Sequence, residues 1–148
     1  SYSKTLPDFL KGAAKFYAKE LGLEKSTYKV FIVTDPHLKK DGSNGVCAKT
    51  GDREITIALY SRLSVIKMMY TLAHEMVHVK QHAKNELSSG HMIATRGGLK
   101  MMSKWKGKIW KPTRKEHAYY DSPWEVEAYG KEVGLYQRYF AWRNNSEC

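Results

Sequence analysis

The feature that most constrains the fold of this chain is an apolar stripe along one predicted helix, with two histidines at its border. The stripe recurs at steps of three and four residues, the period of one buried face of an α-helix. Its members are Val65, Met68, Met69, Leu72, Ala73, Met76 and Val77. His74 and His78 flank the stripe, where half-buried polar groups are costly unless a partner satisfies them. We therefore predict a helix from about Ser61 to Asn85 that carries a polar site at its buried edge.

The same segment reads His74-Glu75-Met76-Val77-His78, an H-E-x-x-H motif. The two histidines are one helical turn apart, so both imidazoles leave the same face and can bind one cation. Glu75 is rotated from them by about 100°, which places its carboxylate beside the cation rather than on it. Zinc held in this way activates water, and a neighbouring carboxylate can accept the proton. The motif predicts one Zn²⁺ per chain and Glu75 as general base in a hydrolysis, most often of a peptide bond.

A catalytic zinc site usually has three protein ligands, so a third must come from elsewhere in the chain. We predict Glu127, on a C-terminal helix. Gly130 and Gly134 follow on its face, and glycine inside a helix costs about 1 kcal/mol relative to alanine. Two glycines on one face suggest that another backbone, which we take to be the motif helix, packs close to Glu127.

Other residues remain alternatives for the third ligand. Glu125 lies on the same helix, but it occupies a capping-box position, from which its side chain is expected to turn back to the Ser122 amide. His91 follows a Ser-Ser-Gly turn that is expected to end the motif helix, so the chain could return from there to the site. His82 is one turn past His78, too far along the axis to join easily, and His117 is a further candidate.

The predicted order of elements indicates an α+β fold in one domain, residues 1–148. A small antiparallel sheet would pack on an N-terminal helix, the motif helix and a C-terminal helix. Beside the motif helix, the predicted elements are a helix Pro7–Leu21, a strand Tyr28–Val33, a hairpin of Val46–Lys49 and Arg53–Leu59, a short strand or hairpin within Lys104–Lys111, and a helix from Pro123 to about Trp142. The predicted buried face of the last helix is Val126, Tyr129, Val133, Tyr136 and Phe140.

Net charge is +10, from 25 lysines and arginines against 15 acids. Many of the cations fall in one segment that also holds Trp105 and Trp110. They are Lys100, Lys104, Lys106, Lys108, Lys111, Arg114 and Lys115. Basic residues interleaved with aromatic ones can hold nucleic acid through phosphate contacts and base stacking. The alternative is a solvated surface that keeps a small protein soluble.

The remaining composition narrows the class of protein. No apolar run approaches the roughly 18–20 residues needed to cross a bilayer. The first residues, Ser1–Pro7, lack the apolar core of a secretory signal, and neither Cys47 nor Cys148 belongs to a C-x-x-C pair. We therefore expect an intracellular protein that acts on a protein or peptide substrate without a membrane.

The motif and a later glutamate-bearing helix resemble the zincin metallopeptidases, more narrowly a minimal gluzincin. The segments His74–Gln81 and Asp121–Gly130 resemble small metallopeptidase-like proteins encoded by bacteriophages, which would imply action in the cytoplasm of a bacterial host. A second resemblance, to SprT/Spartan-like proteases that digest proteins crosslinked to DNA, runs through the motif and Gly90-His91. It implies His91 as the third ligand.

A zinc peptidase also benefits from a donor for the developing oxyanion. The residues that could provide one are Tyr119, Tyr120, Tyr129 and His117. The strand Glu54–Leu59 precedes the motif helix and could offer an edge for an extended peptide. A non-catalytic basic binding module on a zincin fold is the alternative to an enzyme.

Overall fold

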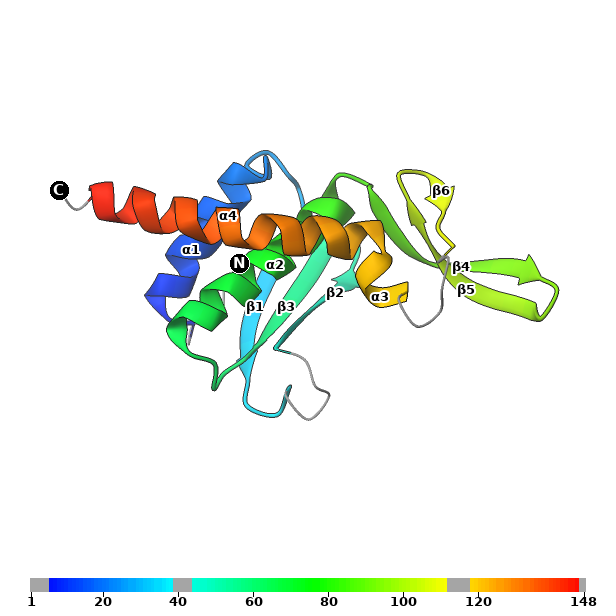
Figure 1. Cartoon of the computed structure of the whole chain (residues 1–148), viewed down its shortest axis with the longest axis horizontal. Helices are drawn as coiled ribbons and strands as arrows, with labels where there is room; N and C mark the ends of the chain where they lie inside the picture. The colour runs from blue at the N-terminus through cyan, green and yellow to red at the C-terminus, as the bar shows by residue number, and fades with distance from the viewer. Residues whose placement is uncertain (1–5, 39–43, 112–117, 147–148) are drawn as a thin grey trace.

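The computed structural model describes residues 6–38, 44–111 and 118–146, and the architecture is α+β, as predicted. Figure 1 shows the helices and strands in chain order. They are α1 (Asp8–Glu20), β1 (Lys29–Asp35), β2 (Gly45–Gly51), β3 (Glu54–Tyr60), α2 (Val65–Ala83), β4 (Leu87–Thr95), β5 (Gly98–Trp105), β6 (Lys108–Ile109), α3 (Ala118–Asp121) and α4 (Pro123–Ser146). Among the described residues, no helix has both the length and the apolar character that crossing a bilayer requires.

The first sheet has the strand order β1-β3-β2. The predicted hairpin is confirmed, because β2 and β3 pair antiparallel. The first strand differs from the expected antiparallel sheet, since β1 pairs with β3 in parallel, with Ile32 opposite Ile57. β3 is therefore the central strand, and the prediction that Glu54–Leu59 offers a free edge is wrong. The edges of this sheet are β1 and β2.

The motif helix α2 forms the centre of the molecule. Figure 1 shows α4 crossing one side of α2, while β1, β2 and β3 lie on its other side. The predicted stripe is buried except for Val65, which is exposed at the start of the helix. Alternate residues of β3, namely Ile55, Ile57 and Leu59, are fully buried in the same core. Ser64 caps α2, its side chain accepting a hydrogen bond from the Lys67 amide at 3.3 Å, so α2 begins later than predicted.

The buried face of α4 is not the predicted one. Most of the predicted residues are exposed, between 43% and 57%: Val126, Tyr129, Val133 and Phe140. The residues that are buried are Glu125, Ala128, Leu135 and Tyr139. The expected packing on Gly130 and Gly134 is also wrong: a Cβ added at Gly130 would meet nothing within 4 Å, and at Gly134 only the Arg138 side chain. The physical reason is that a glutamate occupies the true buried row and interrupts its apolar pattern.

The strands β4, β5 and β6 form a second, antiparallel sheet, here called the ribbon (residues 87–109). Figure 1 shows it extending away from the helices and the first sheet. The predicted turn at Ser88–Gly90 is wrong, because α2 ends at Ala83, Asn85 takes a positive φ of 57°, and Ser88–Gly90 belongs to β4. The predicted hairpin around Gly107 is confirmed.

Candidate metal centre and its cleft

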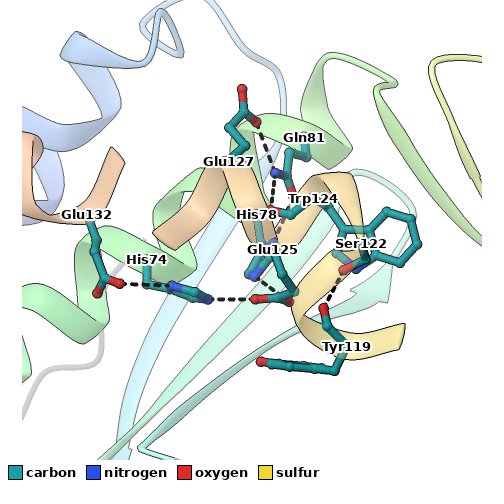
Figure 2. A network of polar contacts seen from close by, with 9 residues as sticks. All are labelled: His74, His78, Gln81, Tyr119, Ser122, Trp124, Glu125, Glu127 and Glu132. Atoms are coloured by element: carbon teal, nitrogen blue, oxygen red, sulfur yellow. Dashed lines mark hydrogen bonds and ion pairs between the residues drawn. The ribbon is translucent and has the colours of Figure 1, made fainter. Parts of the chain in front are cut away.

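Two histidines of α2 and one glutamate of α4 meet at the interface between these helices. The Nε2 atom of His74 lies 3.0 Å from Oε1 of Glu125, and Nε2 of His78 lies 3.1 Å from Oε2. Figure 2 shows the Glu125 carboxylate between the two imidazoles. All three side chains are buried. Among the described residues, these three form the one group of histidine, cysteine and acidic side chains whose ligand atoms lie close enough to hold a metal ion.

The structure places Glu125, not Glu127, at the histidines. The expected capping box does not form, because the Ser122 hydroxyl donates to the Tyr119 carbonyl at 2.7 Å and the side chain of Glu125 turns to the imidazoles instead. Glu127 lies about 200° away from Glu125 around the helix axis. Its carboxylate accepts hydrogen bonds from Lys80 Nζ at 2.7 Å and Gln81 Nε2 at 2.9 Å. The prediction that Glu127 lies at the two histidines is therefore wrong, and Glu125, one of the predicted alternatives, takes its place as the candidate third ligand.

The other predicted histidines do not join this group where the structure describes them. His91 lies on β4, and its Nε2 contacts the Ser88 hydroxyl at 2.7 Å. His82 lies on α2, where burial lowers the pKa of its imidazole. His117, like the basic residues Arg114 and Lys115, lies outside the described residues.

Each imidazole has a second contact, which the sequence reasoning missed. His78 Nδ1 donates to Gln81 Oε1 at 2.8 Å, leaving Nε2 directed at Glu125. Gln81 is fully buried and donates to the Trp124 carbonyl as well as to Glu127, so its amide orientation is fixed. His74 Nδ1 lies 3.7 Å from Glu132 Oε1. Such outer contacts select the tautomer of a metal-binding histidine and orient its ring.

A signal for these partners was present in the chain. Gln81 is three residues after His78, within reach on one helix face. Glu132 is seven residues, or two turns, after Glu125, so choosing Glu125 would also have brought Glu132 to the site.

The charges of the three groups are coupled. Burial alone would lower the pKa of His74, but the Glu125 and Glu132 carboxylates raise it to about 9. The pKa of His78 is raised in the same way, against its burial, by Glu125. Burial would raise the pKa of Glu125, yet the two histidines hold it at about 2. A cation entering the site would take the place of the protons on the imidazoles.

The donor set fits zinc. Two imidazoles and a carboxylate are ligands that zinc prefers. One ligand atom from each of the three side chains lies within 4.8 Å of the others, so His74, His78 and Glu125 would hold such an ion together.

Glu75 lies beside the group and is almost completely buried, with 6% of its surface exposed. Its Oε2 atom has no hydrogen-bond partner among the described residues. Burial raises the pKa of this carboxyl group, against the opposing effect of the two histidines. A buried carboxylate oxygen without a partner is costly, so this atom indicates a position for a polar ligand such as water.

His74 and Glu75 open onto a cleft of about 350 Å³. Three of the four predicted oxyanion donors line it: Tyr119, Tyr120 and Tyr129. The ring of Tyr129 lies 4.5 Å from that of His74. The structure thus brings the predicted base, one of the two candidate metal-binding histidines and these tyrosines to one cleft.

In comparisons with known proteins, no family model matched the chain, and no curated protein or solved structure matched it either.

Proposed function

We propose that this protein is a zinc-dependent peptidase, with His74, His78 and Glu125 as metal ligands and Glu75 as general base. One observation carries the proposal: three converging side chains of ligand type lie next to a buried carboxylate oxygen that lines a cleft and has no partner in the part of the chain that the structure describes. A purely structural metal site has no need of such a carboxylate. His91 takes no part in this form of the proposal, because it lies on the ribbon with Ser88 as its partner.

Each group at the site has a separate role in the proposed hydrolysis. A zinc ion bound here would polarise the substrate carbonyl and activate water. Glu75 accepts a proton from the attacking water through its unpaired Oε2 and returns it to the leaving amine. The hydroxyls of Tyr119, Tyr120 and Tyr129, which line the cleft, are the proposed donors for a developing oxyanion.

The test combines metal content with cleavage. The wild-type protein and the Glu75→Gln variant are reconstituted with zinc, and the zinc content of each is measured by mass spectrometry. Both proteins are then incubated with a mixed peptide library, and cleavage is measured. We expect one zinc per chain in both proteins, and cleavage by the wild type that falls by about 10²-fold or more in Glu75→Gln. Wild-type protein that binds no zinc, or a Glu75→Gln variant that cleaves at the wild-type rate, would overturn the proposal.

A second function is favoured by the charge of the ribbon. The ribbon and the two residues that follow it (residues 87–111) contain six lysines and arginines and no aspartate or glutamate. Lys100, Lys106, Lys108 and Lys111 are exposed. The tryptophans are less available for base stacking, because the rings of Trp105 and Trp110 lie 6.3 and 5.0 Å from that of Trp124. We therefore propose phosphate contacts to nucleic acid through this segment, whether the protein is a peptidase or a non-catalytic binding module.

Nucleic-acid binding is tested by titrating labelled duplex DNA at several salt concentrations. Affinity that falls steeply with salt, and weakens when Lys100, Lys106 and Lys108 are all changed to glutamine, would support phosphate contacts. Affinity equal to that of the wild type in this variant would exclude the ribbon as the contact surface.

A further inference from the structure

The cleft beside Glu75 is acidic in a strongly basic protein. The whole chain carries a net charge of +10. Among the described residues that line the cleft, the acids are Glu75 and Glu132, and there is no lysine or arginine. With Zn²⁺ bound by two neutral imidazoles and Glu125, the carboxylates of Glu75, Glu125 and Glu132 leave the site with one net negative charge. The excess positive charge of the chain therefore lies elsewhere, and the cleft can attract a cation.

Glu132 is placed to receive that cation. It lies on α4 two turns after Glu125, and its side chain is 19% exposed. Its contact to His74 Nδ1 is made by Oε1, at 3.7 Å. Figure 2 shows Glu132 on the side of His74 opposite Glu125. A carboxylate at a partly desolvated cleft wall interacts with a cation more strongly than one at an open surface.

Tyrosine rings form the other wall of the cleft. The rings of Tyr119 and Tyr120 are 5.0 Å apart, those of Tyr120 and Tyr129 are 5.8 Å apart, and Tyr129 in turn packs on His74. The faces of such rings attract ammonium and guanidinium groups.

We propose that this cleft is a specificity subsite for the cationic side chain of a lysine or arginine in the substrate, with Glu132 as counter-charge and Tyr120 and Tyr129 as its aromatic wall. The role in cleavage rests on the proposed peptidase function, whereas binding of the cationic side chain does not. A basic side chain held here lies next to Glu75, so the bond cleaved would be close to a lysine or arginine.

Binding is tested separately from cleavage by NMR titration of the whole protein in the presence of added Zn²⁺. The probes are Nα-acetyl-lysine methylamide and its uncharged counterpart Nα-acetyl-norleucine methylamide. We expect the lysine probe to shift the amide signals of Tyr119, Tyr120 and Tyr129, and to bind about 3- to 10-fold more tightly than the norleucine probe.

The Glu132→Gln substitution should remove this preference for the lysine probe. Glu24→Gln, which removes the same charge from an exposed position away from the cleft, should keep it. Equal binding of the two probes by the wild type would overturn the proposal.

Cleavage tests the same subsite in a second way. Peptides that differ only in lysine or norleucine are compared, and the ratio of their kcat/KM values is taken within each variant. Because Glu132 also contacts His74, a change in metal binding affects both peptides and cancels in the ratio. We expect the ratio to fall about 3- to 10-fold in Glu132→Gln and in Tyr120→Leu, and to be retained in Tyr120→Phe.

The two proposals fail in different ways. Protein that prefers the lysine probe but neither holds zinc nor cleaves peptides would overturn the peptidase function and support the cationic subsite. Protein that cleaves both peptides equally, and binds both probes equally, would support the peptidase and overturn the subsite.

Discussion

The α2–α4 interface, which contains the candidate metal centre, and the ribbon use charge in opposite ways. At this interface Lys80 is buried and paired: it is 8% exposed and lies 2.7 Å from Glu127 and 2.8 Å from Glu86. On the ribbon, Lys100 and Lys108 are exposed in a segment that contains no acid. Buried charges are costly unless paired, so each partner fixes the position of the other. The paired charges between α2 and α4 therefore hold individual side chains in place, whereas the exposed lysines of the ribbon create a positive electrostatic potential at the surface.

The apolar residues show the same contrast. In the core, Leu72 and Val77 are fully buried, while Met92, Leu99 and Met101 of the ribbon are 55%, 69% and 71% exposed. Two strands that lack a packed face are marginally stable by themselves. We therefore expect the backbone amides of β4 and β5 to exchange hydrogen faster than those of α2.

The largest effect is expected from removing the third ligand. Glu125→Ala should weaken zinc binding by about 100-fold or more, because two imidazoles alone do not complete a zinc site. Glu127→Ala is the matched control: it removes a glutamate from the same helix, and it should keep one zinc per chain. Zinc affinity measured by competition with a chelator separates the two. Greater loss in Glu127→Ala than in Glu125→Ala would reverse the assignment.

A smaller loss of zinc affinity is expected when His78 is kept but the orientation of its imidazole ring is no longer fixed. Gln81→Met keeps the size of the side chain and removes the acceptor for His78 Nδ1. Zinc affinity should fall by about 10- to 100-fold, the range for such outer contacts. Gln137→Met makes the same change on the exposed face of α4 and should bind zinc like the wild type. An unchanged affinity in Gln81→Met would mean that packing alone orients His78.

Glu127 is expected to affect stability rather than metal binding, and to do so with a definite pH dependence. Although burial would raise its pKa, Lys80, Gln81 and Lys131 hold it at about 2, below the ordinary 4.5. A depressed pKa in the folded state stabilises the protein above about pH 4.5, and this contribution is lost as pH falls toward 2. Glu127→Gln should therefore cost about 1–3 kcal/mol at pH 7 and less at pH 3. Urea unfolding at both pH values checks this, and an equal cost at both would contradict the ion pair as its cause.

The parts of the site that could be predicted from the sequence are the local ones. His74, Glu75 and His78 follow from one helical turn, and the helix itself follows from its apolar stripe. The third ligand depends on how α4 is rotated about its axis, and a choice between Glu125 and Glu127 is a choice between orientations about 200° apart. The sequence suggested the wrong orientation because Val126, Tyr129 and Val133 form a more regular apolar row than the one that is buried.

The same reasoning explains the errors in the sheets. The hairpin of β2 and β3 is set by a short local turn, and it was predicted. The parallel pairing of β1 with β3 joins segments far apart in the chain, and no local signal determines it. The first part of β4 is wrongly predicted as a turn, because Ser88-Ser89-Gly90 is typical turn material. In the structure these residues lie at an irregularity of the β4–β5 pairing, between Ser88 and His91.

The smallest effect on the fold is expected from the ribbon, and it completes the contrast between the two regions. Changing Lys100, Lys106 and Lys108 to glutamine removes three exposed charges without removing an acidic partner. The free energy of unfolding should change by no more than about 0.5 kcal/mol, as for other surface substitutions, with one zinc per chain retained.

If the ribbon binds DNA, the slope of log K against log salt should become shallower by up to about 2.7 in this variant. The matched variant with Lys15, Lys19 and Lys25 changed to glutamine has the same net charge, and its slope should equal that of the wild type. Equal slopes in all three proteins would mean that the charge of the ribbon serves only solubility. A loss of zinc or of stability in the ribbon variant would mean that the two regions are coupled.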